Sequence, residues 1–195
     1  MCGIAGIVDL AGEREIDRDA LTRMTNALTH RGPDGEGFFI RPGLGFGHRR
    51  LAIIDLVGGV QPFVSGSRDG VLTFNGEIYN YTELADELRG NGANLRTRSD
   101  TEVLTEGLAR DGAQYISRLR GMFAFGFWDA RAQTLTLSRD RLGARYFLGR
   151  RIWELYGVTN AGMAEQVKAI LRGERLHLDE VRVPSKVRDE TWQNI

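Results

Sequence analysis

Met1-Cys2-Gly3-Ile4-Ala5-Gly6 opens the chain and decides how the rest of the sequence is interpreted. Cys2 is the only cysteine among the 195 residues. Removal of Met1 would leave Cys2 with a free thiol and a free α-amine, so that one residue would carry both a nucleophile and a base. An α-amine has an ordinary pKa of about 7.7–8.0, close to the pH at which general-base catalysis is efficient, and nucleophiles activated in this way are an established form of covalent catalysis. The alternative is that Cys2 is a small buried residue at the start of a first strand over residues 3–9.

Composition excludes several classes of function. The 26 basic and 26 acidic residues give a formal net charge of zero, which does not favour a nucleic-acid or membrane partner. No apolar run has the length of a membrane span, and the N-terminus has no basic region followed by a hydrophobic stretch, so we expect a cytoplasmic protein. The three histidines are scattered without metal-ligand spacing, so we expect neither a metal nor a cofactor.

The hydrophobic pattern predicts sheets covered by helices. Asp17 begins a helix, and strands over 36–40 and 44–54 pair around a turn. A strand over 121–128, almost wholly apolar, pairs with a strand over 134–138. Helices together with strands buried on both faces indicate layered sheets in one modest domain.

Three further positions have both a structural and a chemical interpretation. Alternation along the strand puts Arg49 and Arg50 on opposite faces, so one of them points inward, where an anionic ligand would explain it. Asn75-Gly76 is typical of a tight turn, but the Asn amide and the Gly N–H could instead donate together to an oxyanion. Asp100 would serve as a helix N-cap, as would its neighbour Ser99, or it could bind a ligand ammonium.

Six stretches, taken in order, are similar to the motifs of one known family: Met-Cys-Gly-Ile-Ala-Gly at 1–6, His-Arg-Gly-Pro-Asp at 30–34, Gly-His-Arg-Arg-Leu-Ala-Ile-Ile-Asp at 47–55, Phe-Asn-Gly-Glu-Ile-Tyr-Asn-Tyr at 74–81, Ser-Asp-Thr-Glu at 99–102 and Gly-Met-Phe-Ala-Phe at 121–125. The sequence resembles the class II glutamine amidotransferase domain of the N-terminal-nucleophile hydrolases, in its asparagine synthetase branch. The resemblance implies an α+β fold, a four-layer αββα sandwich of two mainly antiparallel sheets.

The resemblance also implies roles for particular residues. Cys2 would attack the side-chain amide of L-glutamine, releasing ammonia and leaving a thioester for water. Asn75 and Gly76 would form the oxyanion hole, and these two residues with Cys2 make the catalytic set. Residues that would bind the substrate are Arg50 at the α-carboxylate, Glu77 and Asp100 at the α-ammonium, and Leu51, Ile53 and Ile54 through their backbone.

The domain boundaries and the partner follow from the same resemblance. We expect the amidotransferase domain over residues 1–150 and a divergent C-terminal extension, to which we assign no fold, over 151–195. The chain contains no Ser-Gly-Gly-x-Asp-Ser loop for ATP pyrophosphate, so an ATP-dependent synthetase domain that would use the ammonia for asparagine biosynthesis is expected to be separate or missing. The alternative is a non-catalytic glutamine-binding or interaction module, a truncated remnant, although binding alone needs no thiol at position 2.

Overall fold

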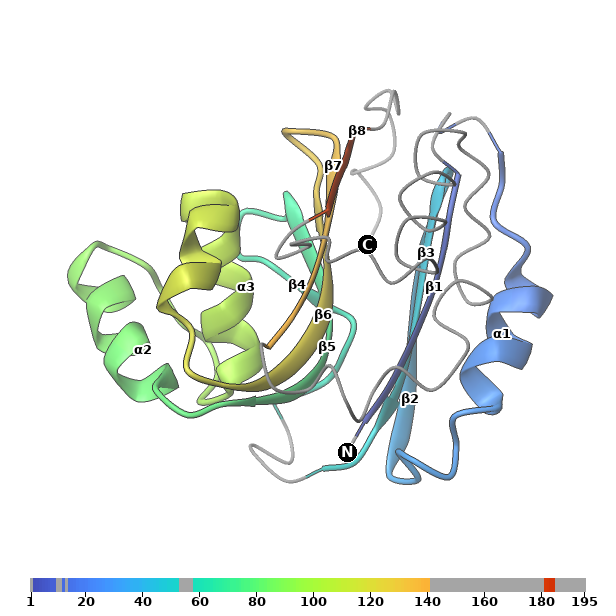
Figure 1. The fold of residues 1–195 in the computed structure, drawn as a ribbon, viewed down its shortest axis with the longest axis horizontal. Coiled ribbons are helices and arrows are strands. Elements are labelled where there is room, and N and C mark those ends of the chain that lie inside the picture. Colours follow the sequence, from blue (N-terminus) through green and yellow to red (C-terminus); the bar gives the residue numbers. More distant parts are fainter. Residues whose placement is uncertain (1, 10–11, 13, 53–57, 141–180, 185–195) are drawn as a thin grey trace, which may run out of the picture.

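The computed structural model describes residues 2–9, 12, 14–52, 58–140 and 181–184, and these form four layers in the order helix, sheet, sheet, helix (Figure 1). The three-stranded sheet has the antiparallel order β1-β3-β2, with β1 at Gly3–Val8, β2 at Gly35–Arg41 and β3 at Leu44–Arg50. The five-stranded sheet has the antiparallel order β4-β5-β6-β7-β8, with β4 at Phe63–Val64, β5 at Gly70–Ile78, β6 at Gly121–Asp129, β7 at Thr134–Arg139 and β8 at Val181–Pro184. The predicted α+β, αββα architecture is confirmed.

Helix α1 (Arg18–Asn26) covers the outer face of the three-stranded sheet. Asp17 is its N-cap, as predicted, and accepts a hydrogen bond from the Ala20 N–H at 2.9 Å. The helix packs closely on β3 because two outward positions of β3, Gly45 and Gly47, carry no side chain. A Cβ at Gly47 would lie 2.0 Å from the Thr25 hydroxyl oxygen, so any side chain there would push the helix off the sheet.

Helices α2 (Tyr81–Gly90) and α3 (Asp100–Asp111) cover the outer face of the five-stranded sheet, and a 3₁₀ helix, η1 (Gly112–Arg118), follows α3. Between these helices and β5 and β6 lies a core that we call the outer core. Its buried members are Leu72, Phe74, Ile78, Leu84, Ala85, Leu88, Val103, Leu104, Leu108, Tyr115, Phe123, Phe125 and Phe127.

A second layer of side chains, which we call the inner layer, fills the space between the two sheets. At one end it is apolar and joins Leu44 and Phe46 of β3 to Val71, Trp128 and Leu135 of the five-stranded sheet. Farther along β3 the inward positions become His48 and then Arg50, because successive residues of a strand alternate between its faces. The inner layer therefore changes from apolar to polar towards Cys2.

The structure corrects one predicted boundary and excludes the turn interpretation of Asn75-Gly76. The strand predicted over 44–54 ends at Arg50. Asn75 and Gly76 make no turn, because both lie within β5 and pair with Ala124 and Phe123. β4 and η1 carry no periodic pattern long enough to predict them. Of the proposed extension over 151–195, the structure describes only β8. No helix in the described part of the chain is long and apolar enough to cross a membrane.

Candidate active site

A pocket of about 120 Å³ opens at the polar end of the inner layer. Seven of the nine predicted site residues line it: Cys2, Arg50, Leu51, Asn75, Gly76, Glu77 and Asp100. The other two, Ile53 and Ile54, lie outside the described residues. The pocket thus combines a thiol, a guanidinium group, two carboxylates and an amide. Among the described residues, no group of His, Cys, Asp and Glu side chains is arranged to hold a metal ion.

Cys2 lies immediately before β1, next to the end of β3. The last registered pair of these strands is Gly3 with Arg49, so continuing the register places Cys2 opposite Arg50. The half-buried Cys2 Sγ accepts a hydrogen bond from the Leu51 N–H at 3.3 Å and lies 3.6 Å from the Leu51 carbonyl oxygen. The Arg31 Nε donates to the Cys2 carbonyl oxygen at 3.2 Å. These contacts fix the thiol at the mouth of the pocket.

The two neighbouring arginines of β3 point in opposite directions, as alternation along the strand predicts. Arg49 points outward, where it hydrogen bonds to Asn26 at the end of α1 and forms an ion pair with Glu36 of β2 at 2.9 Å. Arg50 points inward and lines the pocket. One arginine therefore fastens α1 to the sheet, and the other brings a positive charge to the site.

The edge of β5 that faces away from β6 forms one wall of the pocket. β4 covers this edge only at Val71 and Leu72. Beyond β4, the Phe74 N–H donates to the Gln61 Oε1 at 2.7 Å and the Ile78 N–H donates to an Asp100 carboxylate oxygen at 3.1 Å. Because the N–H groups of a strand alternate between its two edges, the Gly76 N–H is directed to this same edge, between the other two.

Asn75 and Gly76 have environments that suit a donor pair. Asn75 is 5% exposed, and its Oδ1 is buried without a hydrogen-bond partner among the described residues. Gly76 has a φ of 154°, and a Cβ there would lie 2.1 Å from the Met122 carbonyl oxygen of β6. Only glycine fits position 76, since the obstruction is a backbone atom that cannot move aside.

Asp100 begins α3 but does not cap it. The N-cap is Ser99, whose hydroxyl oxygen accepts from the Glu102 N–H at 3.2 Å, so the Asp100 carboxylate is available to β5 and the pocket. Burial raises the pKa of Asp100, and the negative charge of Glu77 acts in the same direction, while hydrogen bonds from Ile78 and Thr101 offset part of the rise. Glu77 itself lies exposed at the rim.

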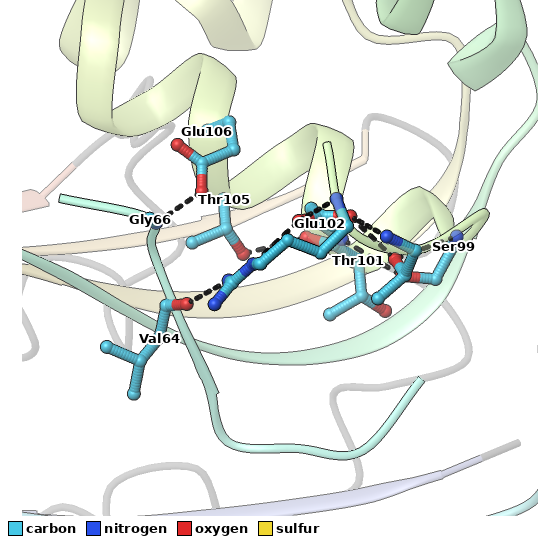
Figure 2. Close-up of polar contacts among 9 residues, drawn as sticks. Val64, Gly66, Ser99, Thr101, Glu102, Thr105 and Glu106 are labelled. Atoms are coloured by element: carbon cyan, nitrogen blue, oxygen red, sulfur yellow. Dashed lines mark hydrogen bonds and ion pairs between the residues drawn. The ribbon is translucent and has the colours of Figure 1, made fainter. Parts of the chain in front are cut away.

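A buried glutamate, Glu102, holds the start of α3 in place (Figure 2). Its carboxylate accepts from the Arg96 N–H at 2.9 Å, the Thr97 N–H at 2.6 Å and the Thr97 hydroxyl at 2.7 Å. Burial raises the pKa of Glu102, but these hydrogen bonds more than offset that effect and lower it below its ordinary value. In the same region, Arg96 donates to the Val64 carbonyl oxygen at 2.9 Å, which ties this loop to β4.

The sequence and the fold of the chain can now be compared with those of known proteins. The family model described as "Glutamine amidotransferase domain" matches residues 1–183. The chain belongs to this family. Its amidotransferase sequence is 38% identical over 149 residues to asparagine synthetase [glutamine-hydrolyzing] 3 of Bacillus subtilis, which covers 75% of this chain and 24% of that protein.

Other relatives of this amidotransferase domain carry similar names. Asparagine synthetase [glutamine-hydrolyzing] 2 of Bacillus subtilis is 40% identical over 147 residues, covering 74% of this chain and 19% of that protein. A putative asparagine synthetase [glutamine-hydrolyzing] of Mycobacterium tuberculosis is 39% identical over 160 residues, covering 74% and 24%. The chain thus spans about a quarter or less of the length of these relatives.

A solved structure agrees with the fold of this amidotransferase domain. The glutamine phosphoribosylpyrophosphate amidotransferase of Bacillus subtilis superposes with a TM-score of 0.53 over 72% of this chain and 37% of that one, at 22% sequence identity. The predicted αββα fold is therefore shared with a solved amidotransferase structure.

The amidotransferase pocket also contains residues that sequence reasoning missed. Gln61 and Thr101 line it, and the Gln61 Nε2 lies 3.4 Å from the Thr101 Oγ1. Behind the pocket, His48 is buried, with its Nδ1 3.4 Å from the Thr73 Oγ1. Burial and the nearby charge of Arg50 lower the pKa of His48 to about 4. The contacts of Gln61 join residues 13 and 40 positions apart, so no local pattern in the sequence indicates them.

Proposed function

We propose that this domain hydrolyses L-glutamine to L-glutamate and ammonia through a thioester on Cys2. The observation that supports this most directly is the composition of the pocket. Groups of the kinds needed for a zwitterionic amino acid and for amide cleavage all line the same cavity of about 120 Å³. The family membership and the glutamine-hydrolysing relatives point to the same substrate.

Substrate recognition in this proposal uses charge at the two ends of the α-amino acid. Arg50 pairs with the α-carboxylate in a charge-assisted hydrogen bond. Asp100 and Glu77 accept the α-ammonium. Burial raises the pKa of Asp100, and an ammonium group beside it would favour its charged form. The backbone of Leu51, which lines the pocket, would complete the binding surface among the described residues.

The chemistry begins once Met1 has been removed. The freed α-amine of Cys2 accepts the thiol proton, and the sulfur forms a bond to the amide carbon of glutamine. Negative charge develops on the amide oxygen, where the Asn75 amide and the Gly76 N–H donate to it. Each such donor typically contributes about 2.7–4 kcal/mol to transition-state stabilisation. The burial of the Asn75 Oδ1 leaves Nδ2 as the amide end available to the pocket.

Two bonds then break in turn. The carbon–nitrogen bond breaks as the α-ammonium of Cys2 returns its proton to the leaving nitrogen, so ammonia departs and the thioester remains. Water, activated by the same amine, attacks the thioester, and the carbon–sulfur bond breaks to release glutamate and restore the thiol. The balance is glutamine and water in, glutamate and ammonia out.

The ammonia is proposed to pass to an ATP-dependent synthetase domain outside these residues. The asparagine synthetases to which the chain is similar are much longer than the matched segment, and this leaves room in them for such a domain. None of the described pocket residues is assigned a role in binding the molecule that accepts the ammonia.

The proposal is tested by an assay for glutamate and ammonia with the purified protein and with Cys2→Ala. We expect the variant to lose the activity while keeping the circular dichroism spectrum and melting temperature of the wild type. Equal activity in both proteins would refute the nucleophile. A wild type that binds glutamine by calorimetry but releases no ammonia would favour the binding module instead.

A second experiment locates the nucleophile independently of turnover. A diazo-ketone analogue of glutamine should add once per chain, and peptide mass spectrometry should place the adduct on Cys2. Glutamine should slow the labelling. Because Cys2 is the only cysteine, an adduct in Cys2→Ala would place the reactive group elsewhere. The intact mass of the unlabelled protein should show the loss of Met1, since a retained Met1 would block the proposed base.

A further inference from the structure

Gln61 is a buried polar side chain in the pocket wall that the mechanism above does not use. It is 6% exposed, and both ends of its amide have partners. The Oε1 accepts from the Phe74 N–H at 2.7 Å, and the Nε2 lies 3.4 Å from the Thr101 Oγ1. Phe74 directly precedes Asn75, and Thr101 directly follows Asp100. Gln61 thus contacts the neighbours of two residues to which the proposal gives separate roles.

The position of Gln61 follows from where β4 begins. β4 pairs Phe63 with Leu72, and continuing that register by two residues would place Gln61 opposite Phe74. β4 begins only at Phe63, after Pro62, so the backbone of Gln61 does not extend the pairing. The chain leaves the sheet there, and the Gln61 side chain, instead of its backbone, supplies the acceptor for the Phe74 N–H.

The backbone of Gln61 is fixed by the opposite sheet. A Cβ at Gly37 of β2 would lie 2.0 Å from the Gln61 carbonyl oxygen, so the two backbones are in direct contact. Gln61 therefore touches β2 through its carbonyl, β5 through Oε1 and α3 through Nε2. It spans both sheets and the helix that carries Asp100.

We infer that Gln61 is a positioning residue for the proposed glutaminase reaction, holding the Asn75–Gly76 donors of β5 and the Asp100 carboxylate of α3 at a fixed separation across the pocket. The inference rests on the proposed function. Donors to an oxyanion act through preorganisation, and displacements of the order of 1 Å can cost about 100-fold in rate. Without Gln61, only the Ile78–Asp100 hydrogen bond would hold this edge of β5 beside Gly76, so the Gly76 N–H could move relative to the bound amide.

The two ends of the Gln61 amide predict different kinetic effects. Its Oε1 restrains the strand with the oxyanion donors, so loss of this contact should lower kcat. Its Nε2 restrains Thr101 beside Asp100, so loss of this contact should raise KM. Gln61→Met keeps the length of the side chain and removes both contacts, whereas Thr101→Val keeps the shape of threonine and removes only the second.

The test is steady-state glutaminase kinetics on these variants in the full chain. We expect Gln61→Met to lower kcat about 10- to 100-fold and to raise KM as well. Thr101→Val should raise KM roughly three- to tenfold with kcat unchanged. Gln61→Glu, which keeps an acceptor for the Phe74 N–H, should recover most of kcat. Gln114→Met, at an exposed position of η1, is the matched control and should match the wild type.

The outcomes separate this inference from the proposal on which it rests. A wild type without glutaminase activity refutes the proposed function, and the inference with it. An active wild type together with a folded Gln61→Met of normal kcat and KM refutes the inference alone, even if the melting temperature falls, because Gln61 would then serve stability only. If Gln61→Met does not fold, an unchanged KM in Thr101→Val refutes it.

Discussion

The outer core and the inner layer of this molecule use the same strands for different purposes. On their outward face, β5 and β6 contribute only apolar side chains to the outer core, such as Leu72, Phe74 and Phe125. On its inward face, β5 contributes Val71, then Thr73, then Asn75, and so becomes polar towards the pocket. Burial of apolar area stabilises at about 25 cal/mol per Å², whereas a buried polar group without a partner costs free energy. The comparison indicates that the outer core and the apolar end of the inner layer contribute stability, whereas the polar end of the inner layer gives up stability to hold the candidate site.

The largest expected effect is on stability in the outer core. Leu88 of α2 is 1% exposed and lies away from the pocket. Leu88→Ala should lower the free energy of unfolding by about 2–5 kcal/mol, because it removes buried methyl groups and leaves a cavity. Urea denaturation measures this, and glutaminase kinetics at low temperature should show an unchanged KM. A variant of normal stability with altered kinetics would overturn the division between the two regions.

Asn75→Ala should show the opposite pattern in the inner layer. We expect kcat to fall about 10²–10³-fold, the range for loss of an oxyanion donor. The free energy of unfolding should change little, since the Asn75 Oδ1 has no partner among the described residues to lose. Steady-state kinetics and urea denaturation on the same preparation test both statements. Near-normal kcat would return Asn75 to a structural role.

His48 should make the inner layer sensitive to acid. Its pKa is about 4 in the folded protein against 6.5 for an unperturbed histidine. Between these values the unfolded chain binds a proton that the folded chain does not, so stability is lost as the pH falls from 6.5 to 4. The loss should total about 3 kcal/mol at 1.36 kcal/mol per pKa unit. Between pH 6.5 and 4, the free energy of unfolding should fall more steeply with decreasing pH in the wild type than in His48→Gln. Parallel curves for the two proteins would contradict this role of His48.

Arg50→Ala should have the smallest effect of this set and should act on binding. An arginine that holds the α-carboxylate equally in the ground and transition states should raise KM by roughly 10- to 100-fold when removed, with little change in kcat. Arg49→Ala is the matched control on the opposite face, where it should weaken the contact with α1 and leave KM unchanged. Equal kinetic effects of the two substitutions would show that alternation along β3 does not separate their roles.

Local patterns predicted sheets layered with helices, and the resemblance to the amidotransferase family supplied the αββα order and most of the site residues. Both failed where distant contacts decide the structure. The opposite directions of Arg49 and Arg50 follow from the two-residue period of a strand. Asn75-Gly76 was open to a turn interpretation because the dipeptide favours turns by itself, but pairing with β6 keeps it extended. The start of α2 carries no clear signal of this kind, because its N-cap, Asn80, makes no side-chain capping bond.

Gln61 illustrates the limit of sequence reasoning most clearly. Nothing in its neighbourhood distinguishes it from a loop glutamine before a proline. Its role depends on the start of β4, the absence of a side chain at Gly37 and the position of Thr101, which only the folded chain brings together. Buried polar bridges of this kind are therefore found from structure.

An unpaired strand edge is a place where two protein chains can join and aggregate. β5 would present such an edge beyond β4, but side chains occupy it in place of a strand, with Gln61 on the Phe74 N–H and Asp100 on the Ile78 N–H. In the proposed reaction, the oxygen of the substrate would take the position between them that a carbonyl of a neighbouring strand takes in an ordinary sheet. Bound glutamine would then pair with the edge of β5 as one residue of a neighbouring strand would. The side chains that protect this edge from other chains would also admit only a ligand small enough to fit between them.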